Sequence, residues 1–100
     1  MSTFNRAPLN EEAVQQALVR LDGWTFENDA IHRTFLFSTF REAMSFMVRV
    51  GFEAEALDHH PELTNVYNRV RVSLNTHDAD NKVTELDAEL ARRINHFSWI

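Results

Sequence analysis

Only two glycines and two prolines interrupt the 100 residues of this chain, and these are the residue types that most often mark turns and linkers. No low-complexity stretch, internal repeat or long linker separates one part of the sequence from another. Two independent cores in so short a chain would each be too small to stand without covalent staples. The sequence therefore predicts one compact domain over residues 1–100.

The charge and composition of the chain exclude several classes of protein. Ten Lys and Arg residues against fifteen Asp and Glu residues give a net charge of −5, so few cations are present to meet nucleic-acid phosphates. The absence of cysteine removes disulfides, thiol nucleophiles and thiolate metal ligands together. The sequence has no run of about 18 apolar residues and no signal-peptide pattern. We therefore expect a cytoplasmic protein with no direct nucleic-acid or membrane partner.

The first forty residues carry the pattern of a helix followed by a β-hairpin. Asn10 is suited to cap a helix, and apolar residues recur at helical spacing from Ala13 to Leu21 before Gly23 supplies a C-terminal stop. Residues 24–37 then alternate between apolar and polar on both sides of a turn at residues 28–29. This alternation predicts two antiparallel strands.

A long helix is predicted from Phe40 to about residue 58 or 59. Thr39 and Glu42 fit a capping box at its start, in which an N-cap hydroxyl is answered three residues later by a carboxylate. Pro61 disfavours helical geometry at His60, so the helix has to finish before that residue.

This long helix is apolar over more of its surface than one contact with a sheet requires. One apolar stripe runs along it, and further apolar residues lie off the stripe. The stripe consists of Phe40, Met44, Met47, Val48, Gly51 and Ala54, and the residues off it are Phe46, Val50 and Leu57. Extra apolar surface of this kind usually marks an interface, so we expect a second copy of the chain as its partner. Trp24 and Trp99 are expected in the core or in an interface.

The second half of the chain has the pattern of another hairpin and a closing helix. The strands are predicted at residues 63–67 and 70–74, with Asn68-Arg69 as the turn. After a loop at residues 78–83, Thr84 and Asp87 fit a cap for a helix that runs to Phe97. The fold class is therefore α+β in the order α-β-β-α-β-β-α, with one four-stranded antiparallel sheet and the helices packed on one face. The pattern leaves the strand order open.

The densest group of titratable side chains lies at the end of the long helix. Glu55 and His59 are four residues apart and share a helix face, with Asp58 between them and His60 directly after. The helix C-terminus and a nearby carboxylate both favour a protonated His59. His77 follows the fourth strand, so three histidines become available for proton transfer near neutral pH.

Three other interpretations stay open from these residues alone. A His-His pair at a helix end is commonly a solvated C-cap. Glu55, His59 and His77 have a spacing that a metal site can use, although the recognised zinc-enzyme helix motifs place a glutamate between two histidines. The apolar face of the long helix also fits a non-enzymatic interaction module. His32 and His96 are expected on the surface.

The spacing of the histidines and their neighbours resembles the signature of the pterin-4a-carbinolamine dehydratases. The matching positions are Glu55, His59, His60, Pro61, Tyr67, His77 and Asp87. Residues 65–68 and 73–77 are similar to the family's hairpin, and the organisation agrees over nearly the whole length. The resemblance implies the α+β layout, no cofactor, and assembly as dimers or tetramers. Animal relatives also act as dimerisation cofactors for a transcription factor, a role that the motif does not carry over.

The resemblance implies a lyase that removes water from a 4a-hydroxy-tetrahydropterin and releases a quinonoid dihydropterin. Aromatic amino acid hydroxylation produces this substrate, so a place in tetrahydrobiopterin recycling and a functional link to phenylalanine hydroxylase are implied. By resemblance, His59, His60 and His77 are the acid and base groups that line the pterin pocket, and no metal takes part.

The resemblance also implies a set of substrate-binding or supporting residues, namely Glu55, Asp58, Ser73, Thr76 and Asp87. Glu55 is expected to orient or charge-stabilise His59, and the backbone before His77 is expected to meet the pterin edge. Asp87 is expected to support the His77 loop, with helix capping alone as the alternative.

Overall fold

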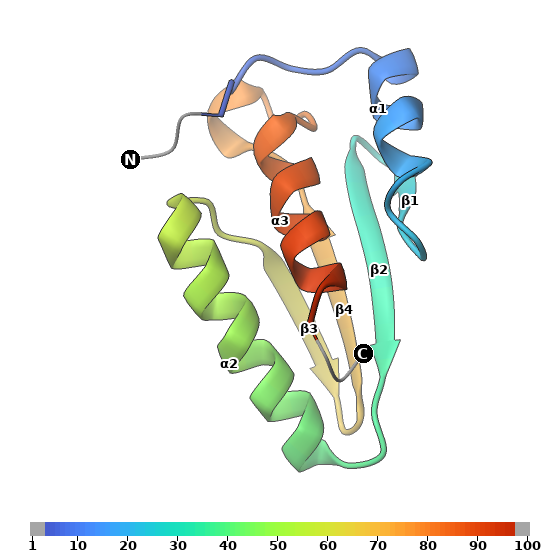
Figure 1. Cartoon of the computed structure of the whole chain (residues 1–100), viewed down its shortest axis with the longest axis vertical. Helices are drawn as coiled ribbons and strands as arrows, with labels where there is room; N and C mark the ends of the chain where they lie inside the picture. Colours follow the sequence, from blue (N-terminus) through green and yellow to red (C-terminus); the bar gives the residue numbers. More distant parts are fainter. Residues whose placement is uncertain (1–3, 98–100) are drawn as a thin grey trace.

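The computed structural model describes residues 4–97, which contain three α-helices and four strands (Figure 1). The elements are α1 (Glu11–Leu18), β1 (Thr25–Glu27), β2 (Ala30–Leu36), α2 (Phe40–Leu57), β3 (Glu62–Val66), β4 (Arg69–Leu74), the short 3₁₀ helix η1 (His77–Ala79) and α3 (Glu85–Asn95). The predicted order α-β-β-α-β-β-α is confirmed. No helix among the described residues is long and apolar enough to cross a membrane.

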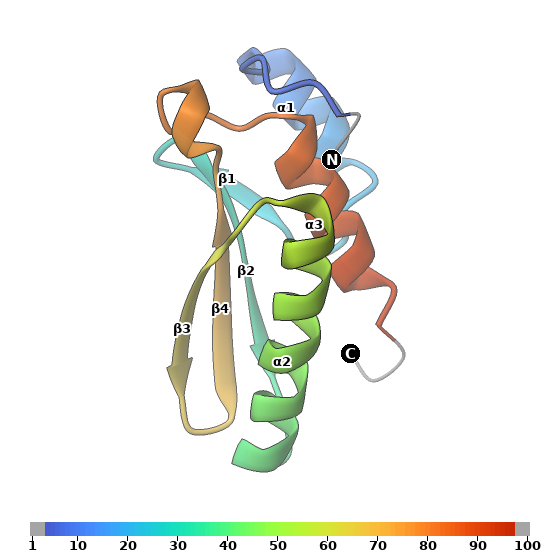
Figure 2. The ribbon, with the colours of Figure 1, turned by 90° about the vertical axis from the view of Figure 1, so that its left-hand side faces the viewer.

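The four strands form one antiparallel sheet in the order β1-β2-β4-β3. The helices α2 and α3 lie against one face of this sheet (Figure 2), so the predicted α+β class is confirmed. The pairing of β2 with β4 joins the two hairpins. In this register, Ser73 lies between His32 of β2 and Glu62 of β3.

Both hairpins use two-residue turns, and each turn contains at least one residue with a positive backbone φ angle. Asn28 and Asp29 have φ values of 53° and 59°, as expected for the tight turn predicted there. The second turn is Tyr67-Asn68 rather than Asn68-Arg69, because Arg69 already pairs with Val66 in the β3–β4 ladder. Tyr67 adopts a φ of 50°. This left-handed conformation is uncommon for tyrosine, so the sequence does not indicate it.

The first helix ends earlier than its apolar pattern suggests. Asn10 caps it as predicted, by accepting a hydrogen bond from the Ala13 N–H at 2.8 Å. The α-helical residues end at Leu18, and the chain then continues through single turns to Gly23. Gly23 has a φ of +85°, so it ends this turn segment and not the helix itself.

The face that α2 buries differs from the predicted stripe. The buried residues are Ala43, Phe46, Val50, Ala54 and Leu57, and only Ala54 among them belongs to that stripe. Both sets recur at helical spacing, so periodicity does not decide which set faces the sheet. The ring of Phe46 lies 4.6 Å from that of Phe35 and 5.0 Å from that of Phe37, which fixes the rotation of the helix.

The other apolar face of α2 remains exposed along the helix. Phe40, Met44, Val48 and Phe52 are 46, 42, 52 and 68 % exposed, and we call these four residues the exposed stripe. Trp24 is buried in the core, as expected. Trp99 lies outside the described residues.

Candidate active site

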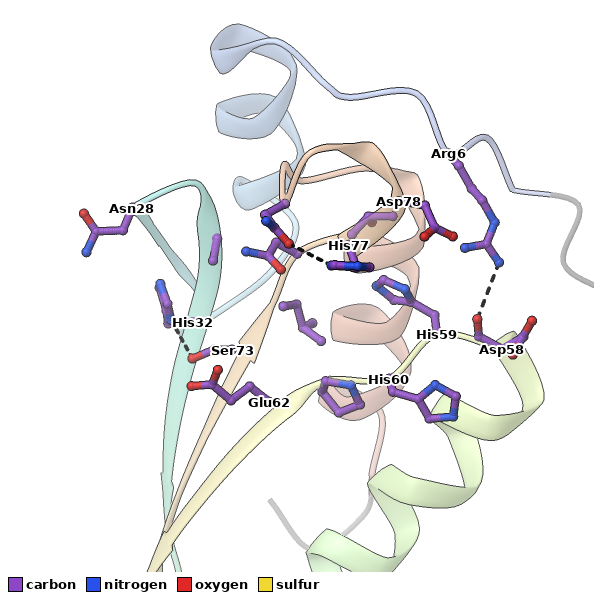
Figure 3. A pocket seen from close by; sticks show the side chains of 16 residues that line it. Arg6, Asn28, His32, Asp58, His59, His60, Glu62, Ser73, His77 and Asp78 are labelled. Atoms are coloured by element: carbon purple, nitrogen blue, oxygen red, sulfur yellow. Dashed lines mark hydrogen bonds between the residues drawn. The ribbon is translucent and has the colours of Figure 1, made fainter.

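A pocket of about 740 Å³ lies where α2 leads into β3 and where β4 leads into η1. Side chains from the β1–β2 hairpin complete its wall (Figure 3). His59, His60 and His77 all line this pocket. Its volume lies in the range of small-molecule sites, so the three histidines can face one bound molecule.

The end of α2 sends its two adjacent histidines in different directions. Asp58 takes a left-handed conformation with φ 51° and ψ 45°, and the His59 N–H donates to the Ala54 carbonyl at 3.0 Å. This reversal closes the helix. His59 is consequently buried at 6 % exposure, whereas His60 is exposed. The helix ends where the position of Pro61 predicted.

His59 is held by a buried carboxylate from α3. Its Nε2 lies 2.5 Å from Oδ1 of Asp87, and Asp87 is fully buried. A carboxylate only accepts hydrogen bonds, so Nε2 carries the proton. In the neutral ring, Nδ1 therefore holds the lone pair and is the nitrogen left for a ligand.

The second oxygen of Asp87 is also fully engaged. Its Oδ2 accepts from the Thr84 N–H at 2.8 Å and from the Thr76 hydroxyl at 2.9 Å. Since the Thr76 proton goes to Asp87, the Thr84 hydroxyl has to donate to Thr76 in their 2.7 Å contact. Asp87 thus caps α3, as predicted, and also supports the segment before His77. Its contact with His59 is one that the sequence did not suggest.

Glu55 contacts His60 and not His59. The His60 Nε2 lies 2.9 Å from Glu55 Oε1, and the two side chains are 63 and 79 % exposed. The expectation that Glu55 orients His59 is therefore wrong, because His59 turns inward to Asp87 after the helix ends. An ion pair between two such exposed side chains contributes little to the stability of the fold.

The loop that carries His77 is fastened to the β1–β2 turn. Thr76 pairs with Lys82 across an isolated β-bridge, and the Lys82 ammonium donates to the Asp29 carboxylate at 2.8 Å. This hydrogen bond raises the pKa of Lys82. His77 itself is exposed, and its Nδ1 lies 3.4 Å from Oδ1 of Asn81. These contacts shape the loop around an accessible imidazole.

Thr76 and Asp58 contribute to the site in different ways. The side chain of Thr76 is buried against Asp87, and its backbone N–H and carbonyl bond within the loop, to residues 79, 81 and 82. These bonds fix the backbone directly before His77. Asp58 lines the pocket, and its carbonyl accepts from Nη2 of Arg6 at 3.4 Å.

The sequence reasoning missed His32. It was expected on the surface, but it is half-buried in the pocket wall, where its Nδ1 lies 2.8 Å from the Ser73 hydroxyl (Figure 3). Ser73 was a predicted site residue. To predict that His32 lies in the pocket, one would have to know that β2 pairs with β4. The hydrophobic pattern does not give this strand order. His96 is exposed, as expected.

The arrangement of the titratable side chains also bears on the possibility of a metal centre. Among residues 4–97, no three His, Cys, Asp or Glu side chains are grouped so that they could hold a metal ion. Glu55 does not join His59 and His77 in one group of ligands, because Glu55 lies against His60 whereas His59 lies against Asp87. The spacing that suggested a metal site is therefore not realised.

A family model, several relatives and a solved structure match this chain. A family model described as pterin 4 alpha carbinolamine dehydratase matches residues 7–97. The chain belongs to this family. Its description names a dehydratase, a lyase that removes water, and the chain is assigned to that class of enzyme.

Relatives of this dehydratase family cover nearly the whole chain. A relative from Opitutus terrae, whose name includes pterin-4-alpha-carbinolamine dehydratase, is 59 % identical over 92 residues, which are 92 % of this chain and 95 % of the relative. A relative from Christiangramia forsetii with the same term in its name is 51 % identical over 86 % of this chain and 88 % of its own. The crystal structure of a transcriptional coactivator/pterin dehydratase from Brucella melitensis matches with a TM-score of 0.84 and 48 % identity, over 88 % of this chain and 95 % of that one.

Proposed function

We propose that this protein dehydrates a 4a-hydroxy-tetrahydropterin to a quinonoid dihydropterin and water, by general acid and base catalysis from His59, His60 and His77. The observation that carries the proposal is the convergence of all three histidines on one pocket. The membership in the dehydratase family gives the class of reaction. The proposal places the enzyme in tetrahydrobiopterin recycling, downstream of aromatic amino acid hydroxylation such as that by phenylalanine hydroxylase.

The reaction needs two proton transfers around one flat ring. The C4a–O bond breaks while the departing hydroxyl takes a proton from an imidazolium and leaves as water. The lone pair of the adjacent ring nitrogen forms the new C=N bond, and the proton of that nitrogen passes to a neutral imidazole. One acid and one base must therefore reach neighbouring atoms, and histidine serves in either state.

The environments of the three histidines suit different parts of this exchange. His59 presents a lone pair at Nδ1, because Asp87 holds the proton at Nε2. The Asp87 carboxylate also stabilises the positive charge that the His59 ring gains when it acts as a base. His60 and His77 are exposed, so they can recover a proton from solvent after each turnover. We propose His59 as the base and one of the exposed pair as the acid.

Replacing His77 by Ala tests the assignment of this residue. We expect the rate of dehydration to fall by at least about tenfold, because one positioned proton-transfer group is lost. The measurement is kcat for a 4a-hydroxy-tetrahydropterin, with circular dichroism and thermal melting as tests of the fold. His96→Ala serves as the control, since His96 is an exposed histidine outside the pocket. Wild-type turnover in a folded His77→Ala variant would remove His77 from the catalytic group.

We also propose that the exposed stripe of α2 packs against a second copy of the chain, giving a dimer or a tetramer. Four large apolar side chains in a row support this proposal, because contiguous apolar surface usually marks an interface. A stripe of this kind also leaves open the interaction-module alternative, in which a different protein occupies the same face.

Replacing Val48 by Glu places a charge within the exposed stripe. We expect the mass measured by size-exclusion chromatography with light scattering to fall toward that of the 11.7 kDa chain, because an unpaired charge in an apolar interface is costly. Ser45→Glu is the matched control, since Ser45 is an exposed residue of the same helix outside the stripe. A wild-type protein with the mass of one chain would contradict self-assembly.

A further inference from the structure

A second set of polar side chains lines the pocket on the side formed by the sheet, away from the three histidines at its other side. His32, Ser73 and Glu62 form one cross-strand row on β2, β4 and β3, and all three line the pocket (Figure 3). Residues opposite each other in antiparallel strands have Cβ atoms about 4.5–5.5 Å apart. The row therefore offers the side chains of Ser73 and Glu62 to the same part of a ligand.

The hydrogen bonds of His32 determine where the Ser73 proton lies. The His32 Nε2 is 2.9 Å from the Glu27 carbonyl, and a carbonyl can only accept, so Nε2 carries the proton of the neutral ring. The Nδ1 of that ring is then an acceptor, and it lies 2.8 Å from the Ser73 hydroxyl. Ser73 consequently donates its only hydroxyl proton to His32. The Ser73 oxygen can then only accept hydrogen bonds from a ligand in the pocket.

We propose that His32 is a positioning residue that makes Ser73 a dedicated hydrogen-bond acceptor, and that Ser73 and Glu62 together select a substrate edge with two N–H donors. This inference rests on the proposed function. A pterin carries such an edge on its pyrimidine ring, where the 2-amino group adjoins the N3–H. That edge lies on the outer side of the pyrimidine ring, so it can meet the sheet while the C4a hydroxyl faces the histidines.

The chemistry of the row explains why it discriminates between ring systems. A site that accepts hydrogen bonds from substrate N–H groups strongly disfavours an analogue that lacks them, because its own acceptors are then left unpaired. Lumazine differs from pterin by a carbonyl in place of the 2-amino group, so it would turn an acceptor toward Ser73 and Glu62. The row should therefore favour 2-aminopteridines over 2-oxopteridines.

The test compares the binding of 7,8-dihydropterin and 7,8-dihydrolumazine by fluorescence titration. We expect the wild-type protein to bind the dihydropterin at least about tenfold more tightly. In His32→Phe, that preference should fall about fivefold or more, because the Ser73 hydroxyl is free to donate. Ser73→Ala should lose the preference directly, and adding His32→Phe to it should change nothing further, since the two residues act through one group.

Thr34→Ala is the matched control, because Thr34 is an exposed residue of β2 outside the pocket and should retain the full preference. Thermal melting checks that each variant is folded, and Ser73→Ala carries the test if His32→Phe does not fold. A preference unchanged in both folded variants, or equal binding of the two ligands by the wild-type protein, would overturn this inference and leave the proposed dehydratase intact. Failure of the wild-type protein to bind either ligand would overturn both.

Discussion

Replacing Asp87 by Asn is expected to lower kcat for pterin dehydration about 100-fold. The side-chain amide can keep its oxygen toward Thr84 and Thr76, and its NH₂ group then faces His59. To accept from that NH₂ group, His59 has to move its proton from Nε2 to Nδ1. The nitrogen that faces the ligand becomes a donor and is no longer a base.

The measurement for Asp87→Asn is kcat together with its pH dependence and a urea unfolding curve. A purely structural role would lower stability and leave the kcat of the folded fraction unchanged, so the two roles separate. Glu12→Gln is the control, because Glu12 is an exposed carboxylate in the first turn of α1 and lies outside the pocket, so its neutralisation should leave kcat unchanged. Wild-type kcat and pH profile in folded Asp87→Asn would show that His59 does not depend on this carboxylate.

Replacing Phe46 by Ala is expected to lower the free energy of unfolding by about 3–5 kcal/mol. Phe46 is fully buried, and its ring contacts those of Phe35, Phe37 and Phe97 at centroid distances of 4.6, 5.0 and 5.9 Å. Truncation would leave a cavity between α2 and the sheet, with aromatic neighbours on several sides. Denaturant unfolding monitored by circular dichroism measures the loss.

Leu36→Ala provides the comparison for Phe46→Ala. Leu36 is a large apolar residue of β2 that is 73 % exposed, so its truncation should change stability by less than about 0.5 kcal/mol. A loss for Phe46→Ala as small as that for Leu36→Ala would contradict the place given to Phe46 at the centre of the core.

The local features of the fold could be predicted because they depend on neighbours in the sequence. The cap at Asn10 and the turn at residues 28–29 each follow from side chains within a few positions. The strand order and the buried face of α2 depend on contacts between distant segments. By helical spacing alone, Phe46 and Met44 are equally suited to the core. Only the packing of Phe46 on Phe35 decides which of them is buried.

The same division applies to the candidate site. His59, His60 and His77 could be found because they stand in a spacing that resembles a known signature. The partner of His59 could not be assigned, since a left-handed residue after the helix turns the ring away from Glu55 and toward Asp87. His32 was missed for a related reason, because its place in the pocket depends on the pairing of β2 with β4.

One carboxylate joins three distant parts of the chain. Asp87 of α3 receives hydrogen bonds from His59 after α2, from Thr76 after β4 and from Thr84 at the N-cap of α3. In the proposed mechanism, Asp87 holds the base His59 in place only when the last helix has docked, so we expect partly folded chains and molecules with a frayed final helix to be inactive. Catalytic activity would therefore depend on complete folding of the chain. Damage to the start of the final helix would lower this activity before it unfolds the rest of the protein.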